Sequence, residues 1–308
     1  MQELMVYAGQ LDIYAKADEV IEKLISVKVN PTMTFRVTNH ISEALKHEDD
    51  QTERILGLPA KDDVLYVEPD GCMLCTRNSE EPWKEVKLAR LFKGSDCLNP
   101  NTESSYICRS QYVAHFGKSR DFCEKLNHVM NAYGDMKDRL IIISDGATWI
   151  REWIADCYPL AISILDFFHV MEHLYDFADK AFPDATQKKT WCDRQKKLLL
   201  ASNVDAVIDN ITIINGHDTE KKALITYYQN NKRRMDYKYY RTIGCGIIGS
   251  GAIESAHRTV VQKRMKLAGQ RWSVTGIKNM LRLRVIENNN QWHKVIHFLQ
   301  TSPLANSA

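Results

Sequence analysis

The sequence predicts an α/β protein with a mixed five-stranded sheet, and three observations point to it. Two continuous apolar runs, RLIIIS and AISILDFF, are typical of strands that are buried on both faces. A segment with helical periodicity follows each of these runs. Residues 63–92 instead hold alternating segments separated by turn residues, which is typical of antiparallel strands.

Length and composition agree with a folded α/β protein. The chain has 308 residues, of which 44% are apolar and 26% are charged, so it can bury one large core or two modest ones. No apolar run approaches the length of a membrane span, and the N-terminus lacks the pattern of a signal peptide. We therefore expect a cytoplasmic protein, and we do not expect its scattered cysteines to form disulfides.

The N-terminal region, residues 1–50, is predicted to be helical. Leu4, Tyr7 and Leu11 begin an apolar pattern with three- and four-residue spacing that predicts a helix over 1–26. Asn30-Pro31 breaks this pattern, and a second helix is predicted over 34–45. The pair could be a helix-turn-helix or a plain helical hairpin. Because neither a third helix nor a glycine in the turn is evident, the hairpin is favoured.

Strands and helices then follow in a regular order. We predict strands at 63–70, ending on Asp70-Gly71, and at 72–76 and 83–92, and we expect residues 97–112 to be irregular. The later elements are a helix at 120–133, a strand ending before Asp145, a helix at 148–157, a strand ending near Asp166 and a further helix. This order, β-β-β-α-β-α-β-α, is that of the ribonuclease-H-like (RNase-H-like) fold, so residues 60–185 are interpreted as the first part of such a domain.

The rest of the chain is predicted to be helical. Residues 186–240 are polar with helical periodicity and are interpreted as an all-helical insertion before a late helix that carries Glu254. Residues 241–295 form this helix and a basic region. Residues 241–308 hold ten Lys or Arg against two acids, whereas the rest holds 31 against 37. This surplus indicates either a polyanionic partner or a solvated basic helix face.

Three carboxylates are candidates for catalysis. Asp70 ends the first predicted strand, Asp145 ends the fourth, and Glu254 lies in the first turn of the late helix. If the first and fourth strands are neighbours, the two aspartates meet at one sheet edge and repel each other unless a hard cation lies between them. Two Mg²⁺ ions bound in this way would serve phosphoryl transfer.

Each carboxylate also has a structural interpretation. Asp-Gly is a common turn, Asp145 could cap the next helix, and Glu254 could favour the helix dipole. Any one of them is weak evidence. All three in this strand order, beside a basic helix, are much stronger.

Three other motifs compete with this interpretation. The glycines at 244, 246 and 249 match the G-x-G-x-x-G pattern of dinucleotide sites, but no buried strand precedes them and no acid follows at the expected distance. We expect them instead to let the backbone approach DNA or the sheet. His169 to His173 match H-x-x-E-H, a zinc-hydrolase pattern, without a convincing third ligand. The single CxxC, Cys72 to Cys75, falls in a predicted strand, where its thiols face opposite sides.

Two longer stretches resemble a known family. IISDGATWIREWIADCYPLAISILDFFHVMEHL and YRTIGCGIIGSGAIESAHRTVVQKRMKLAGQRWS, with LYVEPDG before them, resemble bacterial insertion-sequence transposases of the ISKra type, in the Mutator-like branch of the DDE transposases. The resemblance covers about residues 60–292. It implies catalytic, metal-binding roles for Asp70, Asp145 and Glu254. It also implies an accessory D-x-x-H element at Asp166 and His169, with Asp166 as a rival for the second acid.

The resemblance implies a reaction and its partners. Two Mg²⁺ or Mn²⁺ ions would support cleavage of transposon-end DNA and strand transfer of the 3′-OH into target DNA, by a dimer on DNA in the bacterial cytoplasm at the nucleoid. The phosphate contacts implied are Arg258, Lys263, Arg264, Lys266 and Arg271. The family usually has a longer N-terminal region that recognises the ends, so part of it is expected to be missing here. The alternatives are a catalytically impaired DNA-binding remnant and a zinc hydrolase.

Overall fold

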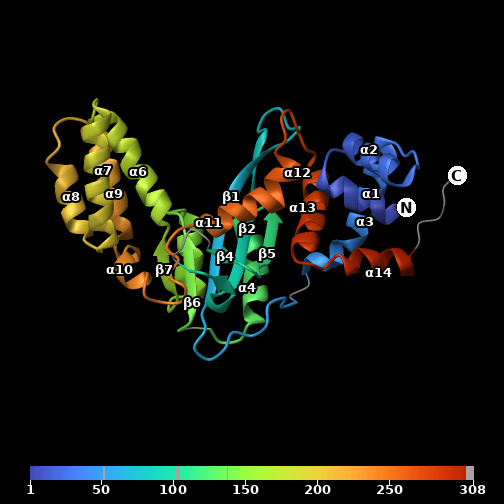
Figure 1. Cartoon of the computed structure of the whole chain (residues 1–308), viewed down its shortest axis with the longest axis horizontal. Coiled ribbons are helices and arrows are strands. Elements are labelled where there is room, and N and C mark those ends of the chain that lie inside the picture. The colour runs from blue at the N-terminus through green and yellow to red at the C-terminus, as the bar shows by residue number, and fades with distance from the viewer. Residues whose placement is uncertain (51–52, 101–104, 137, 303–308) are drawn as a thin grey trace.

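A central sheet with helices at both ends organises the computed structural model, which describes residues 1–50, 53–100, 105–136 and 138–302. Figure 1 shows helices α6 to α10 on one side of the sheet and the N-terminal helices, with α13 and α14, on the other side. No helix in the described ranges is long and apolar enough to cross a membrane.

The sheet has five strands in the order β5-β2-β1-β6-β7. Strand β1 pairs antiparallel with β2 and parallel with β6, β2 pairs antiparallel with β5, and β6 pairs parallel with β7. The bounds are β1 (Leu65–Cys75), β2 (Trp83–Lys93), β5 (Gln111–Phe116), β6 (Leu140–Ser144) and β7 (Ile162–Leu165). The predicted mixed five-stranded sheet is therefore confirmed. A separate two-stranded ladder joins β3 (Cys97–Leu98) to β4 (Tyr106–Ile107).

The predicted strand at 83–92 is confirmed as β2, but the division of the preceding segment into two strands was wrong. The predicted strands 63–70 and 72–76 are one strand, β1, which runs through Pro69 and Asp70 while paired with β2. Proline has no N–H to donate to a neighbouring strand. Pro69 is tolerated because β6 pairs with β1 only as far as Val67, so no β6 residue needs a hydrogen bond from position 69. The third antiparallel strand is β5, in a segment where only an irregular connection was expected up to residue 112.

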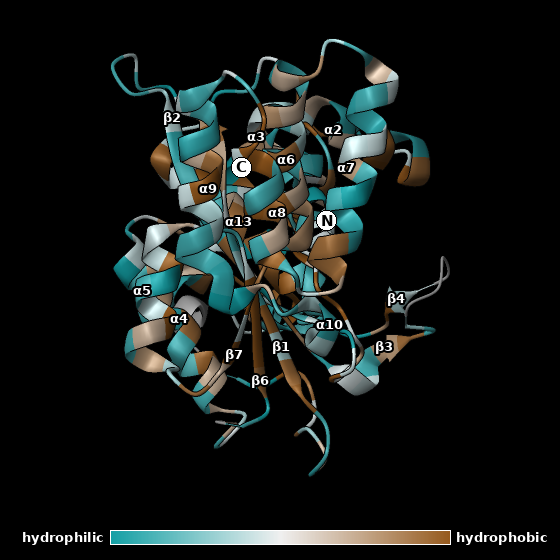
Figure 2. Cartoon of the chain, turned by 90° about the vertical axis from the view of Figure 1, so that its left-hand side faces the viewer, coloured by the Kyte–Doolittle hydropathy of each residue, from teal (hydrophilic) through white to brown (hydrophobic). Residues whose placement is uncertain are grey.

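The later α/β elements lie close to their predicted positions. Helices α4 (Ser119–Asn131) and α5 (Thr148–Cys157) cover one face of the sheet, where Phe122 and Trp153 join a core with Val67. On the other face, α6 (Phe167–Ala181) begins directly after β7. Figure 2 shows β1 and β6 as largely hydrophobic ribbons beside α4 and α5, as expected for strands buried on both faces.

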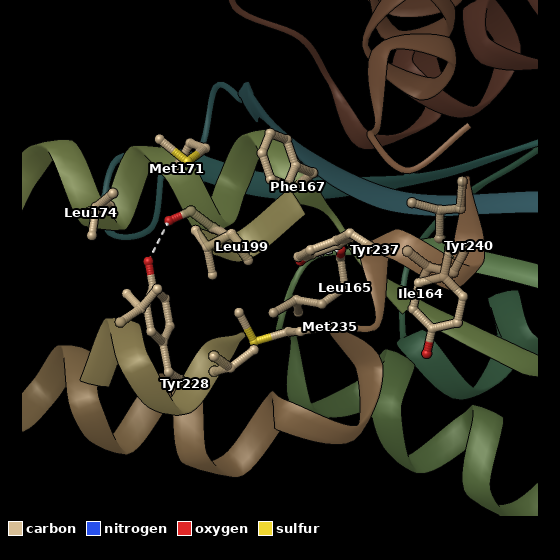
Figure 3. Close-up of a cluster of buried hydrophobic side chains, with 14 of the residues drawn as sticks. Ile164, Leu165, Phe167, Met171, Leu174, Leu199, Tyr228, Met235, Tyr237 and Tyr240 are labelled. Atoms are coloured by element: carbon tan, nitrogen blue, oxygen red, sulfur yellow. Dashed lines mark hydrogen bonds between the residues drawn. The ribbon is translucent and has the colours of Figure 1, made fainter. Parts of the chain in front are cut away.

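Residues 186–240 are helical, as predicted, and pack against α6. They form α7 (Ala185–Leu200), α8 (Val204–Thr212), α9 (Asp218–Asn231), the 3₁₀ turn η3 (Lys232–Arg234) and α10 (Tyr237–Tyr240). Their apolar side chains continue the core of the sheet, since Leu199, Tyr228 and Tyr237 lie in one cluster with Leu165 (Figure 3). The Tyr228 hydroxyl donates to the carbonyl oxygen of Val170 in α6 at 3.2 Å. The helical segment and the sheet thus share one hydrophobic core.

The N-terminal region has three helices rather than the predicted two. The expected helix over 1–26 is interrupted near Asp12, giving α1 (Gln2–Leu11) and α2 (Tyr14–Ile25). Helix α3 (Pro31–Ala44) begins with Asn30 as N-cap and Pro31 in its first turn, and the 3₁₀ turn η1 (Leu45–Asp50) follows. The lack of a third helix therefore no longer argues against a helix-turn-helix.

The C-terminal helices connect the sheet to the N-terminal helices. Helix α11 (Gly251–Ala256) packs on β1 and β2 and continues through a π-helical segment, η4 (His257–Gln262), into α12 (Lys263–Met265). Helix α13 (Val274–Asn288) packs beside β5 and α3, and α14 (His293–Thr301) packs against α1. Glu254 is thereby carried on a helix that lies across the middle of the sheet (Figure 1).

Candidate active site

Three aspartates lie at one level of the sheet. The parallel register places Leu65 opposite Leu140, so continuing it by five residues brings Asp70 level with Asp145. Strand β7 pairs Leu165 with Ser144, and the next residues of these strands are Asp166 and Asp145. Strands β6 and β7 end there while β1 continues, so the three acids lie level at the carboxyl ends of the two parallel strands. Ligands of α/β proteins usually bind at this end of a sheet.

Asp70 and Asp145 lie within electrostatic range of each other. Burial raises the pKa of Asp145 above its ordinary value, and the charge of Asp70 raises it further. The hydrogen bond from Ala147 N–H and the charges of His169 and Arg234 oppose this rise. A pair of carboxylates that repel in a half-buried site is the electrostatic arrangement that favours a bound cation.

His257 holds Asp70 from the glutamate helix. Its Nε2 lies 3.0 Å from Oδ2 of Asp70, without the alignment of a directed hydrogen bond, so the contact is an ion pair. Burial alone would lower the pKa of His257, but Asp70 and Cys72 outweigh burial and raise it to about 9. His257 also begins the π-helical segment, a local distortion that is frequent at functional sites.

Asp166 is buried, and both of its carboxylate oxygens already accept hydrogen bonds. One oxygen accepts the backbone N–H of Phe168 and of Ser250, and the other accepts the N–H of His169 and the hydroxyl of Ser250. Asp166 therefore caps α6 and also fastens the residue that precedes α11. These four hydrogen bonds leave Asp145 better suited than Asp166 to bind a cation.

Glu254 is joined to this edge through Ser250. The Ser250 hydroxyl lies 2.6 Å from Oδ2 of Asp166 and 3.2 Å from Oε1 of Glu254. Glu254 is exposed, whereas Asp70 and Asp145 are half-buried. Within the described ranges, no group of three or more His, Cys, Asp or Glu is close enough to hold a metal ion. The predicted three-carboxylate cluster is therefore not assembled among the described residues, and the side chain of Glu254 is hydrogen-bonded to Ser250.

The N-terminus of α11 is fixed from within the sheet. Oε2 of the fully buried Glu68 accepts the N–H of Ile253 at 2.8 Å, while Oε1 has no hydrogen-bond partner among the described residues. Burial raises the pKa of Glu68 to about 8, against the Ile253 hydrogen bond and the charge of Arg90. Arg90 also donates to the carbonyl oxygen of Ala252 at 2.9 Å. Two sheet residues therefore position the helix that carries Glu254.

Arg234 attaches the helical segment to the same strand ends. Its guanidinium donates to the carbonyl oxygens of Ser144 and Ile164, and to the Ser144 hydroxyl at 2.8 Å. Burial lowers its pKa from the ordinary value, while Tyr227, Tyr237 and then Asp145 act to raise it. The helical segment thus contributes a positive charge beside Asp145.

His169 and His173 pack as aromatic rings. Their centroids lie 4.7 Å apart in an edge-to-face arrangement, and the ring of Tyr227 lies 4.4 Å from His173. Nδ1 of His169 lies 3.2 Å from Oε2 of Glu172, so Glu172 pairs with the first histidine. Since the described residues bring no third ligand to these histidines, the geometry offers no support for the predicted zinc alternative.

Four of the five predicted phosphate-binding residues are exposed. Arg258, Lys263, Lys266 and Arg271 lie on the surface of the late helix and the turn after it. The prediction for Arg264 was wrong, because its side chain is only 2% exposed. Its Nε donates to the carbonyl oxygen of Gly9 at 2.8 Å, and its guanidinium lies between the rings of Tyr14 and Trp272. Arg264 therefore binds the N-terminal helices instead of facing solvent.

The glycine cluster presses a loop against the sheet. A Cβ on Gly244 would lie 2.4 Å from the Tyr66 hydroxyl, and one on Gly249 would lie 2.4 Å from the Phe168 ring. Of the two predicted uses, a close approach to the sheet is confirmed. The loop follows α10 and not a strand, unlike the turn of a dinucleotide site.

One family model matches nearly the whole chain, from residue 3 to residue 298. The chain belongs to the Uncharacterised protein family (UPF0236). No curated protein matches this UPF0236 member. The family description carries no activity, so the resemblance to ISKra-type transposases stays a prediction.

The sequence interpretation missed several residues of this UPF0236 site. Ser250 and His257 were missed although they flank Glu254 at four and three residues, the spacing of one helix face. Glu68 lies two residues before Asp70 and so points to the same face of β1, a signal that the strand pattern did contain. Arg234 and Tyr227 gave no local signal, because Arg234 bonds to Ser144 at a strand end and Tyr227 packs against the histidine rings of α6, both far away in sequence.

Replacing Asp166 by Asn is expected to destabilise the fold by about 2 kcal/mol, because an amide nitrogen cannot accept two of the four hydrogen bonds. The measurement is urea unfolding beside Asp184→Asn, which caps α7 through Gln187 N–H and should cost less than about 1 kcal/mol. Unchanged stability in Asp166→Asn, together with a complete loss of the DNA cleavage that the resemblance implies, would instead make Asp166 the second catalytic acid.

Proposed function

We propose that this UPF0236 member is a DDE transposase. In this proposal the enzyme cleaves transposon-end DNA in a reaction that depends on Mg²⁺ or Mn²⁺, and transfers the freed 3′-OH into target DNA. Its catalytic acids are Asp70, Asp145 and Glu254. DNA is the substrate, two copies act together on it, and the site of action is the bacterial cytoplasm.

The sheet supports an RNase-H-like assignment. Three antiparallel strands, β5, β2 and β1, are followed by the parallel strands β6 and β7, which are joined through a helix. In this interpretation α7 to α10 form a helical insertion between the last strand and the glutamate helix. A fold alone does not determine an activity, so the function has to be argued from the site.

The observation that carries the function is the Asp70–Asp145 pair. The two carboxylates lie level on neighbouring strands, and burial together with Asp70 raises the pKa of Asp145. Carboxylate oxygens are the ligands that Mg²⁺ prefers, and the pair fits a hard cation. The acidic donor set, with Glu254 on the helix above, is the type used in metal-assisted phosphoryl transfer.

The residues of the site would have separate roles in this reaction. Mg²⁺, when bound, would activate the attacking oxygen and stabilise the leaving oxygen. Asp70 and Asp145 would hold it, and His257 keeps Asp70 in its orientation. Ser250 would release Glu254 toward the pair. Outside the pair, the exposed cations Arg258, Lys263, Lys266 and Arg271 would hold DNA phosphates in a largely sequence-independent way.

The test is nicking of a supercoiled plasmid that carries the DNA flanking the coding sequence on both sides. We expect nicking with Mg²⁺ or Mn²⁺ and none with EDTA. DNA binding without nicking under all these conditions would favour the impaired remnant. Stoichiometric zinc, with loss of activity in His173→Ala, would favour the zinc hydrolase. The absence of both DNA binding and nicking would overturn the proposed function.

A further inference from the structure

Two buried cysteines from distant parts of the chain lie in contact. The Sγ atoms of Cys97 and Cys245 are 3.0 Å apart, although 148 residues separate them in the sequence. Cys97 begins the short strand β3, and Cys245 lies in the glycine loop before α11. Both residues are less than 10% exposed, and both carry free thiols. This pair takes no part in the proposed cleavage reaction.

The loop around Cys245 is shaped to make this contact. Gly244 and Gly246 adopt positive φ angles of 52° and 72°, which glycine adopts without strain. A side chain at Gly244 would collide with Tyr66, whose hydroxyl accepts the backbone N–H of Cys245 at 3.0 Å. The backbone therefore holds Cys245 over β1 and against Cys97.

The two thiols differ in acidity. The hydrogen bond between the two thiols lowers the pKa of Cys245 from its ordinary value, against the effect of burial, and the hydrogen bond with Tyr66 lowers it further. The pKa of Cys97 is raised, first by its hydrogen bond with Cys245 and then by burial. Cys245 is thus the better nucleophile, and Cys97 stays protonated beside it.

We propose that Cys97 and Cys245 form a reversible disulfide when a hydroperoxide oxidises the protein. The Cys245 thiol first releases its proton, and the thiolate attacks one oxygen of hydrogen peroxide. The O–O bond breaks, a sulfenic acid forms on Cys245, and the departing hydroxide takes up the released proton as water. The Cys97 sulfur then attacks the Cys245 sulfur, and the sulfenic hydroxyl leaves with the Cys97 proton as a second water. Two thiols are oxidised and one hydrogen peroxide is reduced to two waters.

The geometry favours a disulfide between Cys97 and Cys245 over disulfides that involve the other cysteines. Its formation needs an approach of about 1 Å, since a disulfide spans about 2.05 Å. Cys192, in contrast, is buried in α7 with its pKa raised by burial to about 11. The new bond would tie the loop before Ser250 and Glu254 to β3. Oxidation would therefore fix the segment that leads into α11.

The experiment treats the 308-residue protein with hydrogen peroxide and counts thiols after unfolding. We expect the count to fall from eight to six, with a mass loss of two hydrogen atoms, and dithiothreitol should restore both. Peptide mapping should link the peptides of residues 97 and 245. Oxidised wild type should also migrate faster on a non-reducing gel, because the bond closes a long loop.

Two variants make the result specific. Cys97→Ser should form no disulfide and should gain oxygen mass at Cys245 instead, whereas Cys192→Ser should oxidise like wild type. Far-ultraviolet circular dichroism checks that both variants fold. A persistent count of eight thiols, or a bond between other cysteines such as Cys123 and Cys157, would overturn the proposal. Because no readout uses DNA, failure here is distinguishable from failure of the cleavage function.

Discussion

Replacing Glu254 by Gln is expected to lower Mg²⁺-dependent DNA cleavage by more than about 100-fold. Changing a group that only supports a metal ligand costs up to about 100-fold in activity, and changing the ligand itself should cost more. Glutamine keeps the shape and helix propensity of glutamate but removes the charge that a hard cation requires. Glu254 is exposed, and its contact is the Ser250 hydroxyl at 3.2 Å, so the fold should not change.

A DNA-binding measurement distinguishes a specific loss of cleavage in Glu254→Gln from general damage to the protein. Binding to duplex DNA, measured in Ca²⁺ by gel shift, should stay within about two-fold of wild type, as for a surface substitution. Glu152→Gln is the matched control, because it neutralises an exposed glutamate on α5 away from the paired aspartates, and it should cleave normally. Normal cleavage by Glu254→Gln would remove Glu254 from the catalytic set.

Replacing Arg264 by Ala is expected to destabilise the protein by about 3 kcal/mol, chiefly through a lost charged hydrogen bond and a cavity. The change leaves the carbonyl oxygen of Gly9 without its donor. It also removes a cation that lies about 5 Å from the ring centroids of both Tyr14 and Trp272. Urea unfolding measures the loss.

Lys263 is the neighbouring control for Arg264. It is exposed, so Lys263→Ala should change stability by less than about 0.5 kcal/mol. If Lys263 contacts a phosphate, the slope of log affinity against log salt should become shallower by about one. The opposite pattern, with wild-type stability and a shallower slope in Arg264→Ala, would return Arg264 to the DNA-facing surface.

Strong local patterns predicted the parallel half of the sheet. The apolar runs before Asp145 and Asp166 form β6 and β7 because strands buried on both faces leave a pattern that needs no tertiary information. The antiparallel half was less predictable. Pro69-Asp70-Gly71 has the composition of a turn, yet pairing with β2 keeps it extended. Strand β5 carries a weak pattern because it is an edge strand.

The candidate site was predictable in its acids but not in their partners. Asp70 and Asp145 follow from strand position, and their level arrangement follows from the register. The Asp166–Ser250 bonds cross 84 residues, and the Glu68–Ile253 bond crosses 185, so no sequence window contains both ends. Arg264 was mispredicted because the resemblance grouped it with its basic neighbours as a phosphate contact, whereas in the folded protein it is buried against α1.

The shared level of the three aspartates limits which length changes the chain could tolerate in evolution. One residue inserted into β6 after Ile142, where its pairing with β1 ends, would move Asp145 by about 3.3 Å and turn its side chain to the other face of the sheet. The same insertion between α7 and α8 would leave all three aspartates in place. Among relatives that share this chemistry, gaps should therefore gather in 186–240 and be absent between each strand's paired residues and its acid.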